Sequence, residues 1–287
     1  MKNYQWYPGH MTKAIRQMQE DIKLIDLVIE LVDARIPLSS RNPEIDRVGA
    51  HKARLILLNK ADLADPVANQ SWNDYFTKAG YHLLAINARS GEGLAAINRI
   101  VQEACRDKIA RDLKRGIKNR PVRAMVVGIP NVGKSTFINS FAGKACTKTG
   151  NKPGVTRGKQ WIRLNKQLEL LDTPGVLWPR FEDQAVGMRL AMIGSINDDI
   201  IDTGELALDI LDFLREHYPA AVEKRYGITN ATDNHGMLTE ICINRHCYQR
   251  GQTPDLDRAA TIVVEDLRSG KLGRITLETP ERHGYFR

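Results

Sequence analysis

Short apolar runs recur along the first part of the chain, and the stretches between them place apolar residues at helical spacing. The runs are rich in leucine, isoleucine and valine and have the length of buried strands. Strands that alternate with helices form parallel, doubly wound sheets with helices on both faces. We therefore predict an α/β fold with strands at residues 27–32, 54–58, 82–86, 124–127 and 168–171.

The clearest helical pattern lies between the third and fourth predicted strands, over residues 93–117. Its apolar residues fall on one face and its basic residues on the other, as in a helix that packs on a sheet. The predicted buried face consists of Leu94, Ile97, Val101, Ala104, Ile109, Leu113 and Ile117.

Beyond Pro179 the strand pattern stops and only helical spacing remains, over residues 188–193, 205–214, 237–248 and 256–267. Asp202 or Thr203 and Asp255 are residue types that begin helices, and Ser269-Gly270 is a typical helix end. We expect an α/β domain over residues 1–178 and a small all-α domain over residues 179–287.

Composition narrows the class of protein. No apolar run approaches the roughly 18 residues of a membrane helix, so we predict no membrane span. The first residues resemble neither a secretory signal nor a transit peptide, which favours the cytoplasm. The four cysteines have no paired spacing, which argues against a disulfide framework or a zinc site.

The net charge of +8 is unevenly distributed. Residues 1–200 hold 31 basic and 20 acidic side chains, for +11, whereas residues 201–287 hold 11 and 14, for −3. Two clusters dominate: residues 106–123 have eight basic side chains with two aspartates, and residues 144–166 have seven with no acid. Such fields suit a polyanion such as nucleic acid, although a solvated helix face and a charged loop are the simpler alternative.

A phosphate-binding motif follows the fourth predicted strand. Residues 128–135, GIPNVGKS, fit the pattern GxxxxGK[ST] between a strand and a helix. Backbone N–H groups of such a loop and the helix N-terminus surround phosphates, the lysine reaches the β- and γ-phosphates, and the serine ligates Mg²⁺. The candidate nucleotide-binding residues here are Asn131, Val132, Gly133, Lys134, Ser135 and Thr136.

A guanine-recognition motif, NKAD at residues 59–62, directly follows the second predicted strand. The Asp62 carboxylate can accept hydrogen bonds from the N1–H and 2-amino groups of guanine, a donor pair that adenine lacks. Lys60 is expected to lie along the base, and Asn59 to tie this loop to the phosphate loop. An isolated NKxD is often a surface turn, but ligands of parallel sheets bind at this edge.

Other loops at the same edge carry matching residues. Asn87 and Ala88 follow the third strand, where the Ala88 N–H could meet guanine O6. Asp172 could hold a metal-bound water after the fifth strand, and the Gly175 N–H could meet a γ-phosphate. Thr156, in a basic loop, could supply a second metal ligand.

These five loops resemble the G1 to G5 motifs of TRAFAC-class GTPases, in the order G4, G5, G1, G2, G3 of circularly permuted GTPases. The motifs WYPGHM at residues 6–11, DARIP at 33–37 and GKLGR at 270–274 resemble the ribosome biogenesis GTPase A, or YlqF, family. The resemblance implies a circularly permuted P-loop GTPase domain and a helical RNA-contacting domain. It also implies GTP, GDP and Mg²⁺ as ligands and the large ribosomal subunit with its rRNA, not DNA, as partner of a monomer.

Hydrolysis requires a group that orients the attacking water, and the sequence offers several candidates. Val176 stands where Ras-like enzymes have a water-orienting glutamine. The resemblance implies that His10 is catalytic, together with Lys134 and Thr156, although His10 could instead cap the first helix. Asn131 has a counterpart that helps to bind K⁺ in related GTPases, or else it stabilises the turn.

Three functions remain compatible with the sequence. The first is a GTP-hydrolysing factor for late maturation of the large subunit. The second is a GTP-gated RNA clamp with little hydrolysis, and the third is a switch with a protein partner. The negative charge of the helical part restricts its RNA contacts to patches such as Arg268, Lys271 and Arg274. Because the Asp172–Gly175 loop leads into this part, we expect nucleotide state to set its angle.

Overall fold

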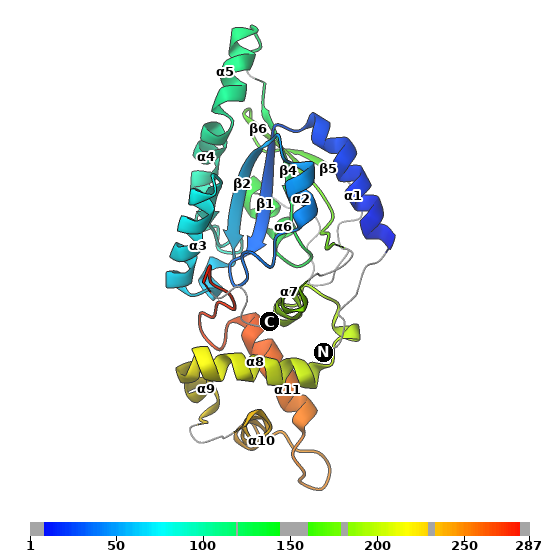
Figure 1. Cartoon of the computed structure of the whole chain (residues 1–287), viewed down its shortest axis with the longest axis vertical. Coiled ribbons are helices and arrows are strands. Elements are labelled where there is room, and N and C mark those ends of the chain that lie inside the picture. The colour runs from blue at the N-terminus through cyan, green and yellow to red at the C-terminus, as the bar shows by residue number, and fades with distance from the viewer. Residues whose placement is uncertain (1–8, 119, 144–159, 179–182, 229–232, 282–287) are drawn as a thin grey trace.

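The computed structural model describes residues 9–118, 120–143, 160–178, 183–228 and 233–281, and it contains one six-stranded sheet (Figure 1). The strand order is β3-β2-β1-β4-β6-β5, and every neighbouring pair is parallel except β5 with β6. The predicted parallel, doubly wound α/β class is confirmed. The strands are β1 (Leu27–Asp33), β2 (Ala53–Asn59), β3 (His82–Ala85), β4 (Val122–Val127), β5 (Gln160–Arg163) and β6 (Leu168–Asp172).

Alternating side chains of β2 cover the two faces of the sheet. Leu55 and Leu57 belong to the larger core cluster, together with residues of α4 (Ile97–Ala104). Ile56 and Leu58 pack instead in a second cluster, with Trp72 and Phe76 of α3 (Pro66–Lys78) among its members. Both faces are therefore buried, which explains why the strands appear in the sequence as continuous apolar runs.

The prediction of one continuous helix over residues 93–117 is wrong, because the structure divides this stretch into three elements. The stretch begins as a 3₁₀ turn (Leu94–Ala96), continues as α4, and is interrupted at Cys105 before α5 (Arg106–Lys114). Leu113 and Ile117, predicted to be buried, are 56% and 40% exposed. The apolar spacing continues, but α5 extends past the end of the sheet and has no surface to pack against (Figure 1).

Strand β5 was not predicted from the sequence. It lies at the edge of the sheet, antiparallel to β6, and holds only two apolar residues in a basic stretch. Trp161 is 40% exposed and lies under the guanidinium of Arg123, 5.4 Å from the ring centroid. An edge strand with one exposed face has a weaker apolar signature than a central strand.

The remaining helices of the sheet region lie on both sides of it. Helix α6 follows the loop after β4 and contacts β6. Asn42 caps α2 by accepting a hydrogen bond from the Glu44 N–H at 3.0 Å. The bounds are α1 (Gly9–Asp21), α2 (Pro43–Val48) and α6 (Lys134–Ala142), with 3₁₀ turns at Ile22–Leu24 and Ala61–Leu63.

Only helices follow Asp183 in the described part of the chain, as predicted. Asp202 and Asp255 cap α8 and α11 through their carboxylates, and Gly270 ends α11 at a φ of 77°. Helix α9 was missed because it is short and begins at a proline. The bounds are α7 (Gln184–Met192), α8 (Thr203–His217), α9 (Pro219–Tyr226), α10 (Asn234–Asn244) and α11 (Leu256–Ser269), with a 3₁₀ turn at Asp198–Ile200.

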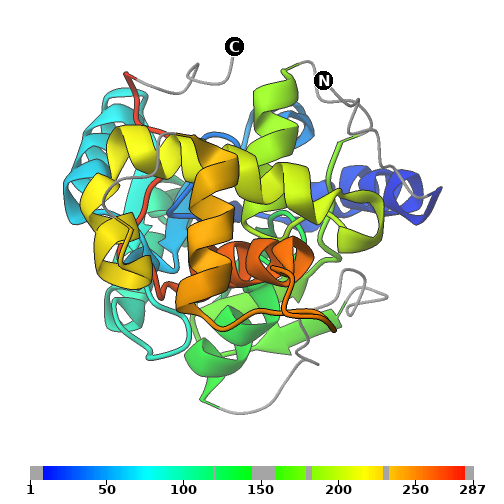
Figure 2. The same cartoon turned by 90° about the horizontal axis from the view of Figure 1, so that it is seen from below.

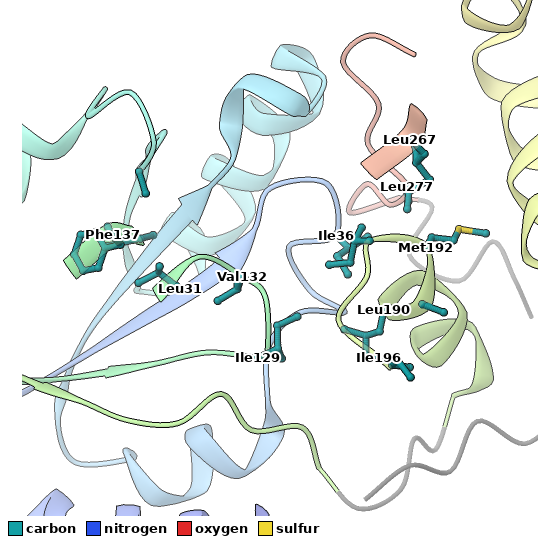
Figure 3. Packing of buried hydrophobic residues seen from close by; sticks show 14 of the residues in the cluster. Leu31, Ile36, Ile129, Val132, Phe137, Leu190, Met192, Ile196, Leu267 and Leu277 are labelled. Atoms are coloured by element: carbon teal, nitrogen blue, oxygen red, sulfur yellow. The ribbon is translucent and has the colours of Figure 1, made fainter. Parts of the chain in front are cut away.

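Helices α8, α10 and α11 pack on one another below the carboxyl edge of the sheet (Figures 1 and 2). One continuous core cluster joins the two regions (Figure 3). Its members include Ile36 and Ile129 at the sheet edge and Leu190 on α7. None of the helices in the described ranges is long and apolar enough to cross a membrane.

The segment after α11 returns to the sheet region. The N–H of Ile275 donates to the Leu63 carbonyl at 3.0 Å, and the N–H of Leu277 donates to the Arg35 carbonyl at 2.8 Å. The indole N–H of Trp72 donates to the Glu278 carbonyl at 2.9 Å. The division of the chain at residues 178 and 179 stays a prediction, and the last described residues of its second part pack on the first.

Candidate functional site

The loop between β4 and α6 has the backbone of a phosphate-binding loop. Gly128 and Gly133 have φ values of 155° and 98°, and Asn131 is left-handed at 58°. A Cβ at Gly128 would lie 2.6 Å from the Leu31 carbonyl oxygen, and one at Gly133 would lie 2.5 Å from Asn59 Nδ2. Only glycine therefore fits these two positions.

Lys134 begins α6 and is buried, with 7% of the residue exposed. Its Nζ donates to the carbonyls of Gly128 and Ile129, both at 3.0 Å, so the ammonium lies inside the loop. Burial lowers the pKa of Lys134 to about 8, opposed by the nearby charge of Asp172. An incoming phosphate would compensate this buried cation.

Asp172 ends β6 and is 1% exposed. Burial raises the pKa of its carboxyl to about 6, against the lowering effect of Lys134. Within the described parts of the chain its Oδ1 has no hydrogen-bond partner. A buried carboxylate oxygen of this kind suits a hydrated Mg²⁺, and the first turn of α6 adds the Ser135 hydroxyl to an oxygen donor set of the type that Mg²⁺ prefers.

The loop after Asp172 packs directly on the phosphate loop. The N–H of Val176 donates to the Gly128 carbonyl at 3.3 Å, and Asn42 Nδ2 donates to the Val176 carbonyl at 3.2 Å. The residues Val176 and Leu177 are 2% and 0% exposed. Val176 is thus held in the core, where an apolar side chain cannot orient a water molecule.

Replacing Gly175 with alanine is expected to destabilise the packing of the loop after Asp172 on the phosphate loop. A Cβ at this position would lie 2.9 Å from Lys134 Nζ and 2.9 Å from Pro130 Cα. Because the backbone of Pro130 must shift, we expect a loss of about 1–3 kcal/mol in unfolding free energy and slower GTP turnover. Thermal unfolding and a turnover assay measure the two effects.

Gly204→Ala is the matched control for Gly175→Ala. Gly204 lies in the first turn of α8, and the nearest atom to an added Cβ is Asp202 Oδ1 at 3.3 Å. We expect this variant to retain wild-type turnover. Equal turnover in both variants would contradict the role of the close approach between Gly175 and Pro130.

Asn59 joins three loops of the site. Its Nδ2 donates to the Val132 carbonyl of the phosphate loop at 2.8 Å, and its Oδ1 accepts from the Ala88 N–H at 3.0 Å. Asn87 closes its own turn, because its Oδ1 accepts from the N–H groups of Arg89 and Ser90. The Ala88 N–H, which was expected to meet guanine O6, donates to Asn59 Oδ1 in this structure.

Lys60 links the guanine-recognition loop to the phosphate loop. It is left-handed at a φ of 59°, and its Nζ donates to the Asn131 carbonyl and pairs with Asp33 Oδ2, both at 2.9 Å. The Lys60 ammonium thus joins the loop after β2 to the phosphate loop and to the end of β1. Asp62 is exposed and available to a ligand.

The side chain of Asn131, a candidate K⁺ ligand, contacts the helical region in this structure. Its Nδ2 donates to the Gly194 carbonyl, after α7, at 2.7 Å. Ser195 Oγ donates to the carbonyl of the neighbouring Pro130 at 3.0 Å. The helical region therefore contacts the phosphate loop directly.

Comparison with known proteins agrees with this geometry. A family model described as 50S ribosome-binding GTPase matches residues 123–235. Ribosome biogenesis GTPase A of Bacillus cereus is 48% identical over 281 residues, or 98% of this chain and 95% of that protein. The chain belongs to the ribosome biogenesis GTPase A family.

More distant relatives extend over the same length. Mitochondrial ribosome-associated GTPase 1 of Bos taurus is 32% identical over 295 residues, covering 95% of this chain and 88% of that protein. The GDP-bound structure of T. maritima YlqF superposes with a TM-score of 0.67 at 26% identity, covering 93% of this chain and all of that one. Membership of the ribosome biogenesis GTPase A family confirms the predicted fold class and makes the chain a GTPase.

Sequence analysis missed the role of the DARIP motif of this GTPase family. Besides Lys60, Asp33 pairs with Arg35, whose Nη2 lies 2.8 Å from Asp33 Oδ2. Arg35 Nη1 also donates to the Arg268 carbonyl at 3.3 Å, at the end of α11. These contacts keep the pKa of Asp33 far below its usual value despite complete burial. The motif could be found by its resemblance to the family, but the Arg268 carbonyl that Arg35 contacts is 233 positions away in the sequence.

Two predicted site residues cannot be placed with the others. Thr156 lies outside the described residues. His10 belongs to helix α1, and only its backbone is described. Thr136, half-buried in the first turn of α6, borders the phosphate loop.

Proposed function

We propose that the chain is a GTP-binding and GTP-hydrolysing assembly factor for late maturation of the large ribosomal subunit, with nucleotide-dependent binding to its rRNA. The observation that carries the proposal is the Asn59 side chain, which donates to the Val132 carbonyl of the phosphate loop and accepts from the Ala88 N–H of the loop after β3. This arrangement supports base recognition and phosphate binding at one sheet edge. The proposal that the ribosome is the partner is supported by the names of the relatives, which refer to ribosome biogenesis and ribosome association.

In this proposal each loop has one task toward GTP. The carboxylate of Asp62 accepts from the guanine edge, while the Lys60 stem lies along the ring. Backbone N–H groups from Val132 to Thr136 surround the phosphates, and Lys134 neutralises their charge. The Gly175 N–H meets the γ-phosphate.

Magnesium would be held by Ser135 and Asp172, with Thr156 as a further ligand. When bound, it neutralises charge that develops on the β- and γ-phosphates. Asp172 Oδ1 is the orphaned buried atom that favours this assignment. Its neighbour Thr173 is fixed by a 2.7 Å hydrogen bond from its Oγ1 to the Val126 carbonyl, which holds the strand end in place.

Hydrolysis needs a group that positions water, and the buried Val176 cannot supply it. We assign this task to His10, whose imidazole can accept a proton near neutral pH. A K⁺ ion beside Asn131 would add positive charge at the γ-phosphate. Since Asn131 Nδ2 is bonded to Gly194, only its Oδ1 is suited to a cation.

The test of this function is GTP turnover in K⁺ buffer, with and without purified large ribosomal subunits, for the wild type and His10→Ala. We expect the subunit to stimulate the wild type strongly and the variant little. Replacement of K⁺ by Na⁺ is expected to lower the stimulated rate. Equal turnover with and without subunits would point to another partner, and an unaffected variant would leave His10 with a structural task.

The burial of Val176 also favours a second function, a GTP-gated RNA clamp that hydrolyses little. A single-turnover assay with saturating subunits separates the two. One round of hydrolysis that is fast relative to dissociation supports the assembly GTPase. Nucleotide that remains as GTP throughout the bound lifetime supports the clamp.

A further inference from the structure

Helix α5 lies at the end of the molecule opposite the helical region and the nucleotide loops (Figure 1). None of its nine residues is buried, although Ile109 packs partly against the core. Lys108 anchors the base of the helix, because its Nζ lies 3.2 Å from Asp26 and 2.9 Å from Asp112. The rest of α5 faces solvent.

Most of the basic side chains on α5 and in the segment after it form no ion pair within the described residues. Of the eight basic side chains over residues 106–123, three pair with carboxylates: Lys108, Arg120 and Arg123. The other five are exposed, and none of them pairs with a carboxylate in the ranges that the structure describes. They are Arg106, Arg111, Lys114, Arg115 and Lys118.

The tip of α5 is ordered rather than frayed. Gly116 has a φ of 76°, its N–H donates to the Leu113 carbonyl at 3.0 Å, and the Ile117 N–H donates to the Asp112 carbonyl at 3.0 Å. These two bonds form a Schellman cap. Leu113 and Ile117, exposed by 56% and 40%, are thus held in place among the cations.

The helical region offers fewer available cations for RNA than its sequence indicates. Arg268 is bound to Asp198 and to the carbonyls of Ala191 and Met192. Lys271 Nζ lies 3.7 Å from the buried Asp266. Of the three cations expected to bind RNA there, two are therefore engaged within the protein.

We propose that α5 and its tip form an RNA-binding surface, with the five unpaired cations against phosphates and the apolar tip against sugar and base edges. The proposal rests on the proposed function, which makes rRNA the partner. Charge complementarity favours a polyanion, because five exposed cations on α5 and the turn after it form no ion pair in the described residues, and Asp107 and Asp112 cannot balance them all. The two ends of the molecule would then meet the ribosomal subunit at separate places.

The experiment measures binding of the full chain to purified large-subunit rRNA as a function of salt. The variant carries Arg111→Gln and Lys114→Gln on the exposed part of α5 and Arg115→Gln at its C-cap. Each lost phosphate contact lowers the slope of log K against log salt by roughly 0.7–0.9, so we expect a decrease of about 2 and an affinity loss of roughly tenfold or more. GTP turnover without subunits should stay at the wild-type value.

The matched control carries Lys78→Gln, Lys224→Gln and Arg250→Gln, three exposed cations away from α5. It removes the same charge and is expected to keep most of the salt dependence. Equal losses in the two triple variants would overturn the α5 surface while leaving the proposed function intact. A wild type without affinity for rRNA or subunits would instead contradict the proposed function itself.

A second variant, Leu113→Gln, tests the tip without altering charge. We expect weaker rRNA binding with an unchanged salt slope, because an apolar contact releases no counterions. If the α5 triple variant lost binding to subunits but bound free rRNA as the wild type does, the surface would contact a ribosomal protein. That outcome would overturn the assignment to RNA.

Discussion

Replacing Lys134 with alanine is expected to lower kcat/KM for GTP by at least about 100-fold, equivalent to roughly 2.7 kcal/mol of transition-state stabilisation. The physical reason is its position. The ammonium lies inside the phosphate loop, held by two carbonyls at 3.0 Å, and no other cation in the described part of the loop can replace it. Steady-state turnover at varied GTP concentrations measures the loss.

The control is Lys78→Ala, which removes an exposed lysine on α3 and should leave kcat/KM unchanged. Thermal unfolding of Lys134→Ala must show a folded protein, because the residue is buried. Activity within a few-fold of the wild type in a folded variant would contradict the assignment of Lys134 to the phosphates.

The pKa of Lys134 also sets a pH dependence. It is about 8 in the free protein, and phosphate oxygens raise it on binding, so above pH 8 the complex takes up a proton. Affinity for GTP should therefore be constant below pH 8 and should fall by up to about tenfold for each pH unit above it. Lys134→Ala should lack this fall.

Replacing Asp62 with asparagine is expected to weaken GDP binding by about 100-fold or more. The hydrogen bond from the 2-amino group, which contributes about 1.5–3 kcal/mol with a charged acceptor, is replaced by two facing donors, and the bond from N1–H loses its charged acceptor. Xanthine carries a carbonyl where guanine carries its 2-amino group, so the asparagine amide can donate to it. Titrations with fluorescent guanosine and xanthosine diphosphates should show the preference reversed.

Asp62 is well suited to this test because its side chain is exposed and the substitution leaves the core untouched. Asp74→Asn, at another exposed position, serves as the control. If Asp62→Asn bound GDP as tightly as the control, the guanine edge would have to be recognised by another loop.

The parts of the site that the sequence predicted are those tied to strand ends. Each of β2, β4 and β6 is a short apolar run, and the polar motif that follows it must lie at the carboxyl edge of a parallel sheet. The local sequence, a strand followed directly by a polar motif, therefore determines where Asn59, Lys134 and Asp172 lie. The circular order of the motifs changes none of this, because neighbouring strands need not be consecutive in sequence.

Contacts between distant segments could not be predicted in this way. Ser195 and Gly194 reach the phosphate loop only because α7 packs beneath it, and nothing in their local sequence indicates that partner. Glu278 is similar, since its buried carboxylate pairs with Arg189 at 3.2 Å and accepts from the Ser39 N–H. The unpacked end of α5 was mispredicted for a related reason, because apolar spacing does not say where the sheet stops.

The return of residues 275–278 to the loop after β1 bears on the order in which the protein is completed. Glu278 accepts from the N–H of Leu38 across 240 positions of sequence. Domains fold as they emerge during synthesis, beginning at the N-terminus, and contacts across long loops form late. The sheet can assemble early, but the loop that holds Arg35 reaches its final bonding only when residues 275–278 have been synthesised. In a nascent chain the nucleotide-binding loops are therefore synthesised before residues 275–278 can bond to the loop after β1 and to Leu63.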